Sequence, residues 1–160
     1  MSPSQYTIIQ PWILRQARED DFPSLYENCW KDQQDARQTF ELALLRQKSG
    51  SAMTVVAATG PDDIPVAFGQ LSRWRSGAEI SDLIVMESWR RRGIGGQIIR
   101  YLIDIARQKP LRYVEIGVER SNPTALRLYK SCGFMEVIPT APSSALIEPP
   151  SIYLRINLRT

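Results

Sequence analysis

The chain has 160 residues, of which 43% are hydrophobic and 23% are charged, and its formal net charge is +3. Such a length accommodates one domain with a continuous core and is short for two, so we expect residues 1–160 to form a single domain. The sequence contains no histidine. This excludes Ser-His and Cys-His nucleophiles and leaves proton transfer to Glu, Asp, Tyr, Cys, Lys or water.

The cysteines and the apolar segments exclude further classes. Cys29 and Cys132 are far apart and follow no metal-binding or redox spacing, so we expect no metal. No apolar run approaches the ~20 residues that cross a bilayer, and residues 1–6 lack the basic and apolar regions of a signal peptide. The sequence therefore predicts a cytoplasmic protein that does not act at a membrane.

Hydrophobic spacing and turn residues predict the elements in chain order. Strands are predicted at residues 12–16, 52–58, 65–74, 78–86, 112–118, 134–138 and 152–157. Helices are predicted to begin at 19–21, to span 36–48 and 93–109, and to run from 123 to before 133. The four prolines within 139–150 predict an exposed loop. Strands mixed with strand-helix units in this order indicate an α/β or α+β domain around one mixed sheet.

The strand at 78–86 has an unbroken apolar centre, Leu83-Ile84-Val85. A strand without alternation of polar and apolar residues is usually buried on both faces. We therefore expect these three residues to be buried in the middle of the sheet.

The segment from Arg90 to Gly96 reads Arg-Arg-Arg-Gly-Ile-Gly-Gly and joins this strand to the next helix. The first N–H groups of a helix have no intrahelical partner, and the helix dipole adds positive charge there. Glycines let a phosphate approach the backbone closely, and arginines add charge, so the segment predicts a pyrophosphate site. A tight turn with solvated arginines is the alternative. Neither the NTPase phosphate loop nor the Rossmann glycine spacing is present.

Two motifs resemble the GNAT superfamily of N-acetyltransferases. The first, Arg90-x-x-Gly93-x-Gly95, is similar to the family's Arg/Gln-x-x-Gly-x-Gly/Ala signature. The second matches a family helix motif at every fixed position, Asn122-x-x-Ala125-x-x-Leu128-Tyr129-x-x-x-Gly133-Phe134. The resemblance implies acetyl-CoA as co-substrate. It also implies a GNAT-like acyl-CoA N-acyltransferase fold, with a central mixed sheet of about six to seven strands flanked by about four helices.

The resemblance implies cofactor-binding residues in three places. The main chain of Leu83, Ile84 and Val85 would pair with the pantetheine arm and the acetyl carbonyl. The pyrophosphate would be held at Arg91, Arg92, Gly93, Ile94, Gly95 and Gly96. Asn122 would bond the pantetheine arm, although capping its helix is an equally good interpretation. Tyr129 would contact the cofactor and protonate the leaving thiolate, and its alternative is a core position on the apolar face of its helix.

The sequence offers several carboxylates as the general base. Glu79 matches the catalytic glutamate of the histone-acetylating branch of the superfamily, and plain solvation is its alternative. Other branches place a glutamate on the next strand, where this chain departs from the pattern with Gly117. Glu115 and Glu119 are possible substitutes on that strand. Asp82 is a weaker candidate for the base and an alternative binder of a cationic substrate.

The resemblance implies direct transfer, in which a primary amine attacks the thioester carbon while both substrates are bound. A backbone N–H near Val85 would stabilise the oxyanion. The sequence does not distinguish a small amine from a protein or peptide amine as the acceptor. It also allows a homodimer that pairs through an exposed late strand. Two alternatives remain: a non-catalytic acyl-CoA-binding module, and a small basic nucleic-acid-binding domain that uses Arg90 to Arg92. We expect no nucleic acid, because the rest of the chain lacks a wide basic stripe.

Overall fold

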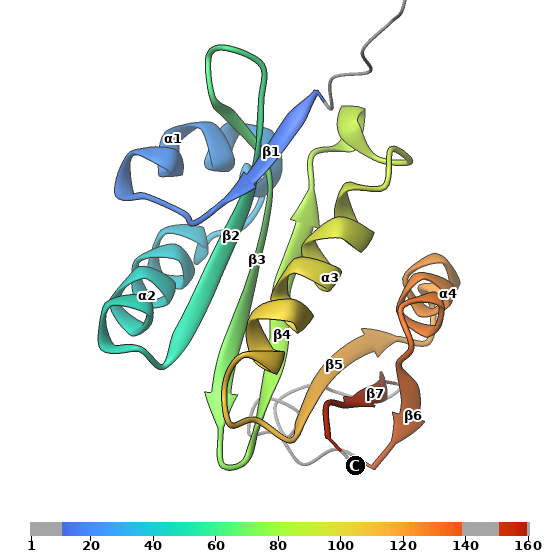
Figure 1. Ribbon diagram of the computed structural model, residues 1–160. Coiled ribbons are helices and arrows are strands. Elements are labelled where there is room, and N and C mark those ends of the chain that lie inside the picture. The colour runs from blue at the N-terminus through green and yellow to red at the C-terminus, as the bar shows by residue number, and fades with distance from the viewer. Residues whose placement is uncertain (1–10, 139–150, 160) are drawn as a thin grey trace, which may run out of the picture.

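The computed structural model describes residues 11–138 and 151–159, which form a seven-stranded sheet in the order β1-β2-β3-β4-β5-β7-β6 (Figure 1). The strands are β1 (Trp12–Arg15), β2 (Ala52–Thr59), β3 (Ile64–Trp74), β4 (Gly77–Val85), β5 (Tyr113–Glu119), β6 (Met135–Val137) and β7 (Ser151–Asn157). Pairing is antiparallel throughout except between β4 and β5, which are parallel. This confirms the predicted mixed sheet.

The helices lie where the sequence predicts them. They are α1 (Phe22–Leu25), α2 (Ala36–Ser49), α3 (Ile94–Arg107) and α4 (Pro123–Ser131), with short turns η1 (Glu19–Asp21), η2 (Tyr26–Trp30) and η3 (Glu87–Trp89). The predicted loop at 139–150 and residues 1–6, on which the signal-peptide argument depends, lie outside the described residues. Within the described ranges, no helix is both long and apolar enough to cross a membrane.

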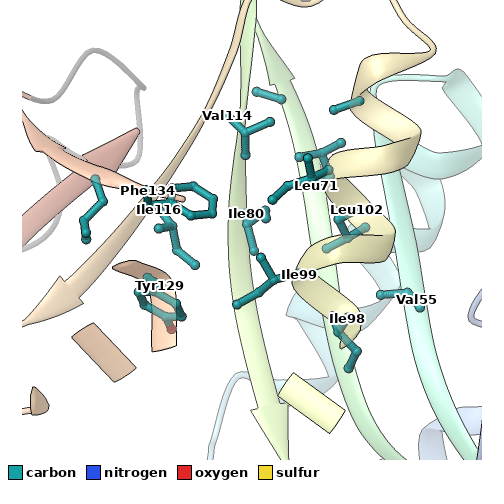
Figure 2. Close-up of a cluster of buried hydrophobic side chains, with 14 of the residues drawn as sticks. Val55, Leu71, Ile80, Ile98, Ile99, Leu102, Val114, Ile116, Tyr129 and Phe134 are labelled. Atoms are coloured by element: carbon teal, nitrogen blue, oxygen red, sulfur yellow. The ribbon is translucent and has the colours of Figure 1, made fainter. Parts of the chain in front are cut away.

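The sheet has a hydrophobic core on each face. Successive residues of β2 show the division, because Val55 belongs to one core and Val56 to the other. Helix α3 covers the first core, where Ile98, Ile99 and Leu102 pack over the sheet (Figure 2). Helices α1 and α2 cover the second core, which is rich in aromatic rings. The rings in contact there are Phe22, Trp30, Phe40 and Phe68.

The sheet separates at the ends of β4 and β5. These strands pair only over 78–80 and 114–116, and beyond this ladder they diverge (Figure 1). A β-bulge contributes to the separation, because Asp82 and Leu83 of β4 together lie opposite Gly69 of β3. Asp82 takes a positive φ of 55° at this bulge. A bulge bends its strand and increases the local twist, so β4 turns away from β5.

This separation corrects one prediction. The residues Leu83, Ile84 and Val85 are half-buried, not buried on both faces. The strand is central, as predicted, since β4 is the fourth of seven strands. Its fully buried part is 77–80, where β5 is still its neighbour. The apolar run begins where that neighbour has left.

Candidate functional site

The turn between β4 and α3 presents free backbone N–H groups. Gly93 is the N-cap of α3 with a φ of 90°, a left-handed conformation that favours glycine. The N–H of Gln97 donates to the carbonyl of Gly93 at 3.1 Å. The preceding N–H groups, those of Ile94, Gly95 and Gly96, therefore have no acceptor within the helix. These N–H groups are the ones from which the sequence predicts a pyrophosphate site.

The three glycines of this turn have different surroundings. A Cβ added at Gly93 would have no heavy atom within 4 Å. A Cβ added at Gly95 or Gly96 would lie 3.6 Å or 3.4 Å from Leu128 of α4. Leu128 of α4 therefore lies over the start of α3, at a distance that leaves an ordinary van der Waals contact for an added methyl group. This packing brings the two motifs of the sequence into contact.

Two tryptophans hold the turn in place, and sequence reasoning missed both. The indole N–H of Trp12 donates to Gln97 Oε1 at 2.9 Å, and the rings of Trp12 and Trp89 meet edge to face at 6.3 Å. The guanidinium of Arg92 lies over the Trp89 ring, 4.6 Å from its centroid. No local signal predicts these contacts, because Trp12 and Gln97 are 85 positions apart in the chain.

The backbone of Val85 faces the gap between β4 and β5. The N–H of Met86 donates to the carbonyl of Val66 on β3 at 2.7 Å. Backbone groups alternate in direction along an antiparallel strand, so the N–H and C=O of Val85 point away from β3. The carbonyl of Val85 accepts from Arg90 Nε at 3.0 Å. The N–H of Val85 points into the same gap, and its role as an oxyanion donor stays a prediction.

Helix α4 places Tyr129 at the same end of the sheet. Asn122 caps the helix, since its side-chain oxygen accepts from the N–H of Ala125 at 3.1 Å. The Tyr129 side chain is buried beside Phe134, with ring centroids 6.5 Å apart (Figure 2). Burial is the main cause that raises the pKa of Tyr129 above its ordinary value of 10. Its hydroxyl therefore keeps its proton at neutral pH, and it makes no hydrogen bond to another described residue.

The candidate base lies on the opposite face of the sheet from α3. Ile80 of β4 packs under α3, so its neighbour Glu79 points to the other face. Glu79 is only 6% exposed, so it is not a solvated surface residue. It is in register with Glu115 of β5, which is fully buried and forms an ion pair with Arg155 of β7 at 2.6 Å. Burial, followed by the charges of Glu79 and Glu115, raises the pKa of nearby Tyr153 to about 12.

The other candidate groups are arranged less favourably for proton transfer. Glu115 is held by Arg155, and Glu119 is exposed and accepts a hydrogen bond from Ser121 at 3.4 Å. Burial raises the pKa of Cys29 to about 11, so this thiol is not a ready nucleophile.

In the part of the chain that the structure describes, no group of three or more His, Cys, Asp or Glu residues is placed to hold a metal ion.

Known proteins resemble the chain in sequence and in fold. A sequence model of the acetyltransferase (GNAT) family matches residues 12–134. The chain therefore belongs to the acetyltransferase (GNAT) family. An uncharacterized N-acetyltransferase of Methanocaldococcus jannaschii is 29% identical over 149 residues, with 82% of this chain and 64% of that protein covered. The chain thus spans less than two thirds of that relative's length.

Solved structures share the fold at lower identity. YncA of Salmonella typhimurium, solved with its cofactor acetyl-CoA, has a TM-score of 0.73 at 19% identity, with 94% of this chain and 96% of that chain covered. Spermidine N-acetyltransferase of Vibrio cholerae, solved with CoA and spermine, has a TM-score of 0.70 at 16% identity, with 92% and 96% covered. The family match confirms the predicted family, and the solved structures confirm the predicted fold class.

Proposed function

We propose that the protein transfers the acetyl group of acetyl-CoA to a primary amine by direct attack. The observation that carries this proposal is the meeting of three features at one end of the sheet. These features are the free N–H groups at the start of α3, the gap between β4 and β5, and the packing of α4 against the start of α3. The solved relatives that bind acetyl-CoA or CoA support this choice of co-substrate.

The proposed cofactor contacts follow from this arrangement. The N–H groups from Gly93 to Gly96 hold the pyrophosphate, and the exposed side chains of Arg91 and Arg92 add positive charge. The main chain of 83–85 pairs with the pantetheine arm along the side that β5 has left. The side-chain oxygen of Asn122 is engaged in the helix cap, so its NH₂ group is the part that contacts the pantetheine arm.

The proposed chemistry uses both faces of the sheet. On the face opposite α3, Glu79 accepts a proton from the amine, directly or through a water molecule. The amine nitrogen bonds to the thioester carbon, and the N–H of Val85 stabilises the negative charge that develops on the oxygen. The carbon–sulfur bond then breaks, and Tyr129 donates its proton to the departing thiolate. Holding both substrates in the gap supplies much of the rate.

The acceptor is proposed only as an amine. The spermidine N-acetyltransferase of Vibrio cholerae shows that this fold accommodates a small polyamine, although fold alone does not determine the substrate. A second copy of the chain is a further proposed partner, through the edge strand β6. Met135 on that strand is 73% exposed.

Thermal-shift titration with acetyl-CoA, CoA and ATP tests the proposal first. A ligand that binds only the folded state raises the melting temperature, so both CoA species should raise it and ATP should not. An amine-acceptor screen follows, with release of free CoA thiol as the readout. Stabilisation by CoA without turnover on any amine would favour the non-catalytic acyl-CoA-binding module. Stabilisation by none of the three ligands would contradict the proposal and direct attention to nucleic acid as a ligand of Arg90 to Arg92.

A further inference from the structure

The bulge in β4 carries an exposed carboxylate that a buried side chain holds in place. The carboxylate belongs to Asp82, which accepts a hydrogen bond from Gln70 Nε2 at 2.5 Å. Gln70 comes from the neighbouring strand β3 and is only 5% exposed. The contact therefore orients a surface carboxylate by means of a residue that has little freedom to move.

The other half of the Gln70 amide has no hydrogen-bond partner among the described residues. A carboxylate only accepts hydrogen bonds, so the nitrogen of the amide must face Asp82 and the orientation of the amide is determined. The oxygen, Gln70 Oε1, is then buried without a hydrogen-bond donor among the described residues. An unsatisfied buried acceptor costs stability. Positions that break this rule in natural proteins are often functional, and here the amide has one visible use, which is to hold Asp82.

Acidic side chains lie on the same face of the sheet as Gln70. Gln70 lies opposite Ser81 in the β3–β4 register, which places Glu79, two residues earlier, on the same face of the sheet. Glu115 continues this row on β5, and one cation in the row, Arg155, is paired with it. Through its contact with Gln70, the carboxylate of Asp82 thus lies on the same face of the sheet as the candidate base, from which we propose that the amine attacks.

We propose that Asp82, oriented by Gln70, binds the second, protonated nitrogen of a diamine or polyamine acceptor. This inference rests on the proposed function and names its substrate class. Asp82 is three residues before Val85, a separation of about 10 Å along a strand that rises about 3.3 Å per residue. A butyl chain alone is shorter than this separation, and the hydrogen bond to Asp82, about 3 Å between heavy atoms, makes up most of the difference. An acceptor with a butyl or longer chain therefore has its second charge near Asp82 when the first nitrogen reaches the gap. Gln70 is a positioning residue in this scheme.

Steady-state kinetics with 1,4-diaminobutane, spermidine and butylamine test the inference, with Asp82→Asn as the first variant. Asn tolerates a positive φ well, so the bulge is retained. The loss of a charge-assisted hydrogen bond should raise KM for the two polyamines about tenfold. KM for butylamine and KM for acetyl-CoA should stay within the error of the wild-type values. Asp104→Asn, which removes an exposed carboxylate from α3, is the matched control and should change none of these constants.

Gln70→Leu separates positioning from folding. It should raise KM for the polyamines in the same way, while its melting temperature equals or exceeds that of the wild type, because the unsatisfied oxygen is removed. A purely structural glutamine would show the opposite: a lower melting temperature with unchanged KM values. Equal effects of Asp82→Asn on butylamine and on the polyamines, or no effect on either, would overturn the inference.

Calorimetry of 1,4-diaminobutane binding to the CoA-bound protein distinguishes this inference from the proposed function. Binding that weakens about tenfold in Asp82→Asn supports the amine site even if no acetyl transfer is detected. Acetyl transfer to butylamine, without tighter binding of the diamine, leaves the proposed function standing and overturns the inference.

Discussion

The two faces of the central sheet are built in different ways. On the α3 face, the helix N–H groups and the side chains that we assign to the cofactor come from two short segments, 90–97 and 122–129, each of which forms a helix start with its cap. On the opposite face, the groups that we assign to the acceptor come from the paired strands β3 and β4, and Glu115 of β5 and Arg155 of β7 lie in the same row. The cofactor side is therefore encoded locally, whereas the acceptor side depends on strand pairing. Variants on each face should separate cofactor binding from acceptor chemistry.

The largest effect is expected from Tyr129→Phe. Loss of a general acid lowers kcat about a hundredfold to a thousandfold, and KM for acetyl-CoA should change little because the ring and its contact with Phe134 remain. Steady-state assays of CoA release measure kcat and KM for acetyl-CoA. A rate equal to that of the wild type would remove Tyr129 from the mechanism and leave it as a core residue.

The pH profile sharpens this test. Burial raises the pKa of Tyr129 above 10, and the protonated form is the active one, so wild-type kcat should not fall through loss of this proton until the pH exceeds 10. Tyr129→Phe should lack that alkaline decrease. An alkaline decrease that is the same in both proteins would have to come from another group.

Glu79→Gln is expected to lower kcat about a hundredfold at neutral pH, because the amine then loses its assisted proton transfer. The defect should shrink as the pH rises, since more of the acceptor is already deprotonated. Thermal stabilisation by acetyl-CoA should be unchanged, because Glu79 lies on the face opposite α3. Glu119→Gln, at an exposed glutamate of the next strand, is the control and should retain the wild-type profile.

A smaller effect is expected from Trp12→Phe. Trp12 lies on the edge strand β1, and its side chain reaches the turn that we assign to the cofactor. The variant keeps an aromatic ring against Trp89 and loses the hydrogen bond to Gln97. A net loss of about 1 kcal/mol in the placement of the turn raises KM for acetyl-CoA about fivefold. The acceptor KM should not change. Trp74→Phe, near the other end of the sheet, controls for a general loss of packing.

The smallest effect is expected from Gly95→Ala. The added methyl group would lie 3.6 Å from Leu128, an ordinary contact distance, so KM for acetyl-CoA should change by less than about twofold. Gly93→Ala provides the contrast, because its φ of 90° strains any residue with a side chain and should raise KM more. Equal, large increases in KM for acetyl-CoA in the two variants would contradict this ranking. They would show that the phosphate approaches the backbone at both positions too closely for a side chain.

Local physics explains why much of the molecule was predictable from its amino-acid order. Each helix end depends on residues within one helical turn of it. Examples are the end of α2 at Gly50, the start of α3 at Gly93 and the cap of α4 at Asn122. The predicted strands and helices follow from spacing and turn residues in the same way. The mixed-sheet fold class and the positions of the turn at 90–96 and of Tyr129 therefore follow from the amino-acid order, and the family was predicted from the resemblance of two motifs to known sequences.

Other features depend on which strands meet and where their pairing is interrupted. The half-buried state of Leu83 to Val85 follows from the divergence of β4 and β5, and the hydrogen bond from Gln70 to Asp82 follows from the bulge between β3 and β4. The contact between Trp12 and Gln97 depends on an edge strand reaching a distant helix. Hydrophobic periodicity carries no information about these pairings, because the same alternation suits several registers and several neighbours. Amino-acid order thus determined the elements and the cofactor motif, and strand pairing in three dimensions determined the acceptor face.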